Sequence, residues 1–456
     1  MRNCPAPLRC CLGALALTAP LWLQAQTLPA LLEAALATDP ALAAARAQVQ
    51  VQEQRLTQAR ASRGPSVGFS LVANDTRYRE RLSGNGDRSF ANQQAALQIN
   101  QPLFRPALGH AIDAAQAQLE QAEAGLQQAQ SDAMLRLIDA TFDALKTRDA
   151  LHLLHAQRVL TDEQLAAAKR KFQLGATSVT DVREAEAQVD GVAAQLHTAG
   201  QELELRMQVL AELTGNNPEG LLTRGLTGKQ LPKVTSDSVL QWLATATAQS
   251  AQLRQAQQVV TAAQAEVRRA EQGHLPTVDL VGTVQRYNDT GTPVSISGRR
   301  GDSAQLGINI NVPLYTSGAT QARVEETRAL QAKAEGDMAA LRRTIAVQVR
   351  QAFSQNLSAV GQVKALEAAL RSAELSYLAN KRGFEVGMKV TAEVLDAQSR
   401  VFEVKRDLSR ARYDAWATYE RLRATSGQLD GSDFVQLEEL LVALPPDTPI
   451  TPGPQG

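Results

Sequence analysis

Two turns, 172–181 and 384–393, contain the residues of this sequence that are most able to bind ions or to form specific polar contacts. The polar side chains in or just after them include a hydroxyl, an amine and three carboxylates that are candidates for a site, namely Thr180, Asp181, Lys389, Glu393 and Asp396. Such carboxylates can bind cations, pair with a basic group, or cap the helix that follows, because helix N-termini favour negative charge. Simple capping therefore stays open as the role of Asp181 and Glu393. A solvated lysine stays open for Lys389.

Each turn contains one glycine where the chain must reverse, Gly175 in the first and Gly387 in the second. Glycine tolerates the positive φ that a reversal at a helix end requires. The residues on both sides of each turn are rich in Ala, Gln, Leu and charged side chains, which are strong helix formers. The pattern predicts two helical hairpins.

Other chemistry is poorly supported by the residue pattern. His152 and His155 lie one helical turn apart, but no acid or third histidine is arranged around them, so we interpret them as surface residues. No Gly-rich phosphate loop, nucleophile elbow or metal cluster is recognisable. We therefore expect no enzyme, no cofactor and no dedicated metal site.

Charge and composition limit the partners and the compartment. The 456 residues include 47 basic and 47 acidic ones, a balance that does not favour nucleic acid as a partner. Residues 1–25 resemble a secretory signal peptide, with Arg2 and Arg9 ahead of an apolar core. All three cysteines lie inside this segment, so the mature chain is expected to form no disulfide. No later stretch is apolar for the roughly 18–20 residues of a spanning helix.

The sequence contains an internal repeat. Ile99–Phe104 matches Ile310–Tyr315, and Gly215 matches Gly427, at nearly the same separation as the two turns. We expect structural repeats at 26–215 and 238–427, joined by a connector at 216–237. A tail at 428–456 follows, and the composition of its end predicts disorder.

Each repeat has the same predicted order of helix, two strands, very long helix, turn and helix. The strands are expected at about 66–82, 89–103, 277–288 and 303–314. Prolines mark all four helix–strand junctions, where they end helices and ladder pairing: Pro65, Pro102, Pro276 and Pro313. The first helix is expected from about 28 to 62, and the long helix from 107 to 171, at 1.5 Å per residue, would extend roughly 100 Å.

An apolar residue recurs every seventh position after each turn, which indicates a coiled-coil seam. The seam positions are Val182, Val189, Leu196, Leu203 and Leu210, and in the second repeat Val394, Val401, Leu408, Ala415 and Leu422. Aromatic residues make up only 4% of the chain, so little material is present for a thick globular core.

The four strands alternate apolar residues with uncharged polar ones, most clearly between Ser303 and Leu314. Alternation alone fits equally well a soluble sheet with one face on a core. Strands of more than ten residues with an amide-rich face are typical of a membrane β-barrel. Four strands cannot close such a barrel, and three copies of the chain would supply twelve.

The segments Gly273–Leu280, Val312–Tyr315 and Val386–Ala397 resemble the outer-membrane efflux protein family. The resemblance implies an α+β membrane protein: a homotrimer with a twelve-stranded barrel in the outer membrane of a Gram-negative bacterium. A long α-helical coiled-coil barrel would extend from it into the periplasm. It further implies a passive exit duct for drug efflux or type I secretion. Its partners would be outer-membrane lipid, a periplasmic adaptor (membrane fusion) protein and an inner-membrane RND or ABC transporter.

The resemblance also implies roles for the turn residues. The latch that holds the entrance shut falls on Thr180, Asp181, Phe384 and Lys389. Two acidic, cation-binding rings fall on Glu393 and Asp396, and the tips at Gly175 and Gly387 would dock the adaptor. Phe384 stands where the archetype of the family has Tyr, Lys389 where it has Arg, and Glu393 where it has Asp. Because Phe384 lacks the hydroxyl of tyrosine and Lys389 cannot form a bidentate fork, we expect a weaker latch. The alternative interpretation is a soluble periplasmic coiled-coil scaffold.

Overall fold

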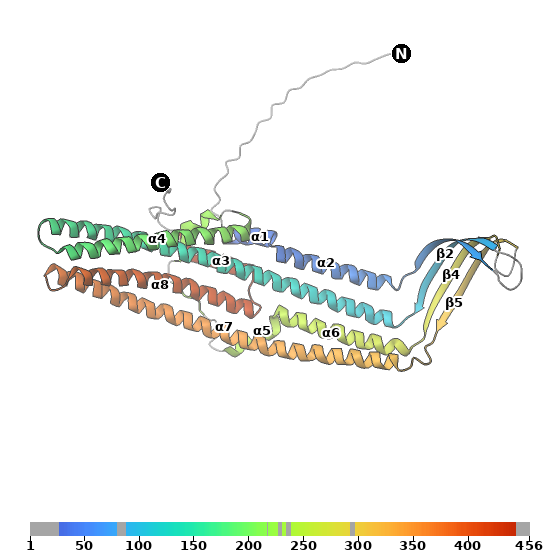
Figure 1. Cartoon of the computed structure of the whole chain (residues 1–456). Coiled ribbons are helices and arrows are strands. Elements are labelled where there is room, and N and C mark those ends of the chain that lie inside the picture. The colour runs from blue at the N-terminus through green and yellow to red at the C-terminus, as the bar shows by residue number, and fades with distance from the viewer. Residues whose placement is uncertain are drawn as a thin grey trace, which may run out of the picture.

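The computed structural model is an elongated layer of helices that ends in a sheet (Figure 1). The described residues are 27–79, 88–216, 218–226, 230–233, 239–291 and 297–443. The predicted signal peptide, the hairpin tip at 84–87 and the chain end beyond 443 lie outside them.

Two helices of 67 residues each determine the length of the molecule, α3 (Ala107–Gln173) and α7 (Ala319–Glu385). At 1.5 Å per residue each is roughly 100 Å long. Each is followed by a turn and a returning helix, α4 (Val179–Thr214) or α8 (Thr391–Thr425). The helices lie side by side, with α4 at one edge of the layer and α7 at the other (Figure 1).

The predicted coiled-coil seam is buried in both returning helices. In α4, Val182, Val189, Leu203 and Leu210 are buried and Leu196 is half-buried. In α8, all five seam residues from Val394 to Leu422 are buried. The seven-residue period therefore identified the side of each helix that packs against its neighbours.

The first predicted helix, 28–62, is in fact two helices, and that prediction was wrong. α1 (Leu28–Thr38) and α2 (Pro40–Ala61) are bent by 56° relative to each other. Asp39 causes the break, because its carboxylate accepts hydrogen bonds from the first amides of α2 and Pro40 starts that helix.

The second half of the chain repeats this device. α5 (Val239–Gln249) and α6 (Ala251–Glu271) are separated by Ser250, whose hydroxyl accepts a hydrogen bond from the Leu253 amide. Among the described helices no single one has the length and apolar character needed to cross a membrane, and the bent pair α1–α2 meets that criterion jointly.

Four antiparallel strands form the sheet in the order β1, β2, β4, β5. Their bounds are Ser66–Tyr78, Arg88–Phe104, Thr277–Asp289 and Arg299–Asn311. The last strand ends earlier than the predicted 303–314, because Pro313 lacks the amide hydrogen that a continuing ladder would need. Its start is four residues earlier than predicted.

The apolar face of the sheet is uncovered within the described chain. Phe69 is 71% exposed, Leu306 76% and Ile308 63%. The edge strands β1 and β5 have no partner strand on their outer sides among the described residues.

The prolines lie where helix passes into strand. Pro65 and Pro276 directly precede β1 and β4, Pro313 follows β5, and Pro102 lies beside a register shift near the end of β2. Arg105 follows β2 and donates to both carboxylate oxygens of Asp279 in β4, at 2.8 and 2.6 Å. This bidentate pair fastens the base of the sheet to the start of α3.

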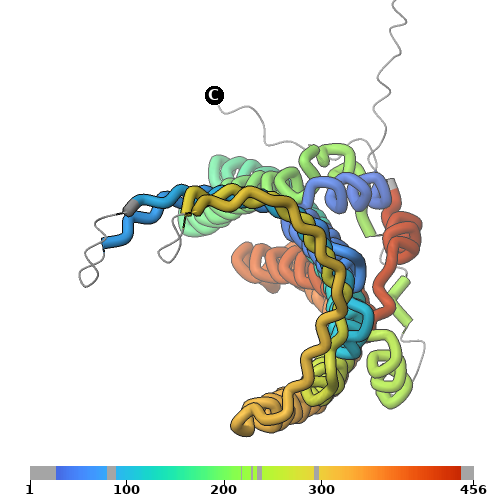
Figure 2. The backbone as a smooth tube through the Cα atoms, turned by 90° about the vertical axis from the view of Figure 1, so that its right-hand side faces the viewer, coloured from blue at the N-terminus to red at the C-terminus, as the bar shows by residue number. Residues whose placement is uncertain are grey.

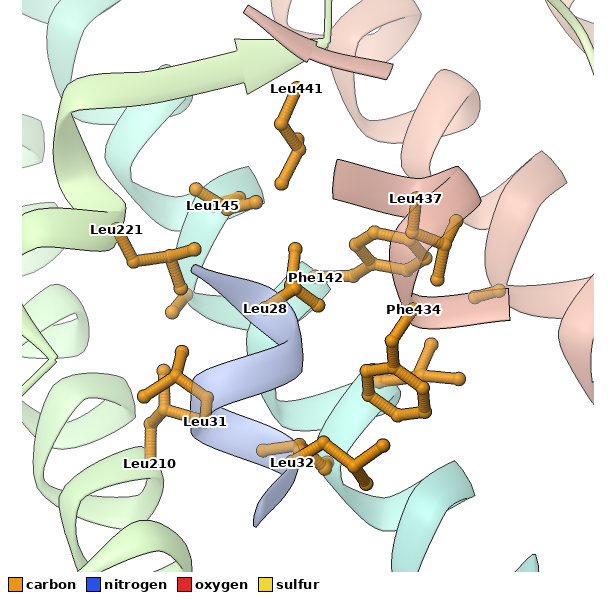
Figure 3. Packing of buried hydrophobic residues seen from close by; sticks show 14 of the residues in the cluster. Leu28, Leu31, Leu32, Phe142, Leu145, Leu210, Leu221, Phe434, Leu437 and Leu441 are labelled. Atoms are coloured by element: carbon orange, nitrogen blue, oxygen red, sulfur yellow. The ribbon is translucent and has the colours of Figure 1, made fainter. Parts of the chain in front are cut away.

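The main core lies midway along the helices, where α1 and α9 (Gly431–Leu440) cover α3 (Figure 3). Its fully buried members come from distant parts of the chain, among them Leu28, Phe142, Leu221, Phe434 and Leu437. Figure 2 shows that the layer curves into an arc, with α1 and α9 on its convex side.

The connector and the tail contain structure that the sequence analysis did not anticipate. A 3-10 helix, η1 (Glu219–Thr223), leads into β3 (Arg224–Leu226), which pairs with β6 (Leu441–Ala443). Together with α9, these elements contribute buried side chains to the main core. η1 and β3 precede the second repeat in the sequence, whereas α9 and β6 follow it.

Candidate functional site at the helix tips

The two predicted turns lie near each other at the end of the molecule farthest from the sheet (Figure 1). Gly175 has φ of 69° and Gly387 has φ of 79°. A side chain would meet no atom within 4 Å at either position, so the positive φ alone demands glycine. The Gly175 amide donates to Phe172 O at 2.9 Å, and the Gly387 amide to Phe384 O at 3.0 Å.

Asp181 is held in the N-terminal cap of α4. The Asp181 amide donates to the Ser178 hydroxyl at 3.3 Å, and the Ser178 amide donates to the Asp181 carboxylate at 3.1 Å, which is a capping box. The Thr177 hydroxyl also donates to this carboxylate. These hydrogen bonds, that of Thr177 foremost, hold the pKa of Asp181 below its usual value, and the Thr391 hydroxyl of α8 adds to them.

Thr391 therefore links the two turns, since it begins α8 whereas Asp181 lies in the first turn of α4. A second link joins the ends of the long helices, where Lys171 Nζ lies 4.2 Å from the ring centroid of Phe384. Neither Thr391 nor Lys171 was a candidate from the sequence. A lysine in the last turn of a helix is ordinarily explained by its favourable interaction with the helix dipole. The sequence therefore offered no reason to expect a contact between Lys171 and an aromatic ring.

Lys389 pairs with Glu393, one turn further along the start of α8, and not with Asp181 of its own chain. Both side chains of this pair are half-exposed. Asp396 is exposed and forms no ion pair within the described chain, and Thr180 is exposed in the first turn of α4. The structure thus places a predicted latch residue and a predicted ring residue in direct contact.

The turns rest on a small apolar cluster that fixes their relative position. Ala168 of α3, Val182 and Ala185 of α4, and Leu395 of α8 are buried together. Above them the Gln188 amide donates to the Ser399 hydroxyl at 2.5 Å. The two hairpins of one chain therefore form a joined unit with an acidic and hydroxyl-rich end.

The comparisons with known proteins agree with this architecture. The family model described as "Outer membrane efflux protein" matches residues 31–216 and again 242–428. This chain therefore belongs to the outer membrane efflux protein family.

Among individual relatives, Outer membrane protein TolC of Vibrio cholerae serotype O1 is 28% identical over 401 residues, covering 88% of this chain and 90% of that protein. Proteases secretion protein PrtF of Dickeya chrysanthemi is 26% identical over 412 residues, covering 89% of each. The solved structure of the outer membrane protein VceC from Vibrio cholerae superimposes with a TM-score of 0.71 at 20% identity, covering 88% of this chain and 96% of that one. The last likeness shows the fold.

Family membership locates the chain in the outer membrane, as the resemblance implied. It favours the exit duct over the soluble scaffold that the alternation of the strands had left open.

Proposed function

We propose that three copies of this chain form a passive exit channel through the outer membrane, with the tip turns of all three copies at its periplasmic entrance. The observation that carries the proposal is a four-stranded sheet with an exposed apolar face and two unpaired edges, mounted on helices roughly 100 Å long.

The sheet supports a closed barrel of several copies. In lipid an unpaired strand edge leaves backbone groups without hydrogen bonds, so a sheet that faces lipid has to close. Four strands are too few, whereas β1 of one copy against β5 of the next, repeated three times, gives twelve.

The helical layer supports the same arrangement. Its two edge helices expose large apolar side chains, Val347, Leu357 and Leu375 on α7 and Leu205 and Val209 on α4. Neighbouring copies that bring α4 against α7 would bury them, which favours association. The recurring element order and the two family-model matches support an internal duplication, which supplies six tips per trimer.

At the entrance, Asp181 and Thr180 of one hairpin with Phe384 and Lys389 of another form the latch. Glu393 and Asp396 form acidic rings that attract cations. Lys389 is shared between Glu393 and the latch, because it already pairs with that carboxylate. A contact between half-exposed charges is worth about 0–1 kcal/mol, so the latch is weak in each copy.

The partners follow from the exposed tips and from the relatives. Leu174 beside Gly175 is 83% exposed, and Met388 beside Gly387 is 79% exposed, which offers a periplasmic adaptor protein an apolar contact. An inner-membrane RND or ABC transporter would supply the energy. PrtF is named for protease secretion, and the family for efflux, so both small solutes and proteins are candidate cargo.

Cysteine cross-linking tests the assembly. We would place one cysteine at Ser70 in β1 and scan a second along β5 from 305 to 309, in the mature chain expected to be cysteine-free. Intermolecular disulfides should give dimer and trimer bands in the outer-membrane fraction. The matched control pairs Gln98 with Thr283, which face each other within one chain and should give no ladder. A monomeric, soluble product at every β5 position would contradict the proposal.

A further inference from the structure

A depression of about 470 Å³ lies among α3, α4 and α8, well away from the tips. Three helices contribute four cationic side chains to its lining, namely Lys146, Arg206, Arg406 and Arg410. Acidic residues of the lining include Asp143 and Asp407.

The depression opens on the concave side of the layer. Arg148 of α3 is buried and donates to the carbonyls of Leu222 and Arg224 at 2.7 and 2.6 Å, on the convex side where η1 and β3 lie. Lys146 precedes Arg148 by two residues, about 200° around the helix, so it points to the opposite side. Asp143 and Ala150 share the face of Lys146 and also line the depression.

Most charges in the depression are already paired. Lys146 Nζ lies 3.0 Å from Asp143 and 2.7 Å from Asp414, and Arg206 lies 3.4 Å from Glu202. Two arginines differ from these. Arg406 donates only to the neutral amide oxygen of Gln195, at 3.1 Å.

Arg410 makes no ion pair or side-chain hydrogen bond with any described residue, and it is exposed. Asp407 is likewise exposed and without such a partner in the described chain. The unpaired charges are therefore two guanidinium groups and one carboxylate, which leaves each copy with net positive charge available to a ligand.

We propose that this depression binds the carboxylate or phosphate group of a small anionic solute on the inner wall of the duct, through Arg406 and Arg410. A guanidinium group presents a planar fork of N–H donors that matches either oxyanion, and charge-assisted hydrogen bonds of this kind are stronger than neutral ones. The neutral Gln195 amide oxygen that accepts from Arg406 competes only weakly with an anionic ligand for this guanidinium group. The inference rests on the proposed function, since the concave side becomes the interior only in the assembled channel.

The site has a function that the acidic tips cannot supply. Acidic rings at the entrance repel anions, so an anion that has passed them gains from a local positive site further along the wall. Asp407 lowers the affinity of this site, which lets the solute leave. Removing Asp407 should therefore strengthen binding.

Block of single-channel current by citrate, and separately by inorganic phosphate, tests the site in planar bilayers. The double variant Arg406→Gln with Arg410→Gln should raise the blocking concentration about tenfold or more, because two charge-assisted hydrogen bonds are lost. Asp407→Asn should lower it several-fold. Arg371→Gln removes one positive charge from an exposed α7 residue outside the depression and should leave block unchanged.

Unchanged block in the double variant, or an equal loss in Arg371→Gln, would overturn the binding site and leave the channel standing. A chain that forms no channel would overturn the proposed function. Calorimetric titration of the detergent-solubilised protein with citrate then decides the site independently: binding that the double variant lacks supports it, and no binding by the unmodified chain overturns it.

Discussion

Lys171 Nζ lies over the ring of Phe384 at 4.2 Å from its centroid, so the far ends of α3 and α7 meet through a cation and an aromatic face. The family resemblance had implied that Phe384 weakens the latch, because it lacks the hydroxyl of tyrosine. The contact needs only the ring face, and it is worth about 0.5–1 kcal/mol at an exposed site. Phe384 thus keeps a role at the tip that the missing hydroxyl does not remove.

Phe384→Leu should loosen the closed entrance. Three copies that each lose roughly 0.5–1 kcal/mol shift the closed-to-open ratio by roughly 10- to 150-fold. Open probability in planar bilayers measures the shift. Phe384→Tyr keeps the ring face and should behave as the unmodified chain or close more tightly. If Phe384→Leu leaves the open probability unchanged, the contact does not contribute to the closed state.

The pairing of Lys389 with Glu393 predicts opposite effects for two changes at one tip. Lys389→Ala leaves Glu393 without its neutralising partner, so block of the channel by divalent cations at the periplasmic side should strengthen. Glu393→Ala together with Asp396→Ala should weaken that block, by about tenfold if both carboxylates contact the ion. Block that weakens in Lys389→Ala would show that the lysine does not shield the ring.

Asp181→Ala removes the N3 partner of the Ser178 capping box and should destabilise the start of α4 by about 0.5–1 kcal/mol, the low end of the range for losing a cap. Hydrogen exchange at the amides of the first turn of α4 should rise correspondingly. Because the pKa of Asp181 lies below its usual value, the contribution of its carboxylate to the capping box is complete above about pH 4 and is lost as the pH falls through the lowered pKa. Glu184→Ala, one turn on and exposed, serves as the control and should change neither result.

Regular periodicity made much of the fold predictable. The seven-residue period identified the buried side of α4 and α8, and the strict alternation around Ile308 identified a strand. The exposure of its apolar face is a finding of the structure. The break at Asp39 was missed because alanine-rich helix continues on both sides of it. The pairing of β3 with β6 was missed because each strand has only three residues. The two strands also lie on opposite sides of the second repeat in the sequence, so that Arg224 pairs with the distant Ala443.

The tip turns were located from glycine and the capping acid, which are local signals. The contacts of Lys171 with Phe384 and of Thr391 with Asp181 depend on how two hairpins pack, and no local pattern encodes that. The pair of Lys389 with Glu393 was missed for a different reason, because the family resemblance had assigned Lys389 to the latch alone. Its partner within the chain, Glu393, lies four residues away, the commonest spacing of helical ion pairs.

The deeply buried carboxyl group of Glu420 predicts a pH dependence of stability. Glu420 in α8 is 2% exposed, and burial raises its pKa to about 8, with Asp433 and Asp430 of the α9 cap adding to the rise. Arg423 opposes them but lies 4.0 Å away from Glu420 and 2.9 Å from Asp433. The folded chain therefore binds this proton more tightly than the unfolded chain does.

Because its pKa is raised on folding, protonated Glu420 contributes its full stabilisation of the fold below about pH 4.5. This contribution to the free energy of unfolding disappears as the pH rises through about 8. The melting temperature of the detergent-solubilised protein should fall between pH 5 and pH 9, with a loss on the order of a few kcal/mol in each copy. Glu420→Gln keeps the shape and the neutral state, so its melting temperature should depend much less on pH over this range. Glu403→Gln, at an exposed position of the same helix, should retain the full dependence. Equal slopes for the unmodified chain and Glu420→Gln would assign the pH dependence to other groups.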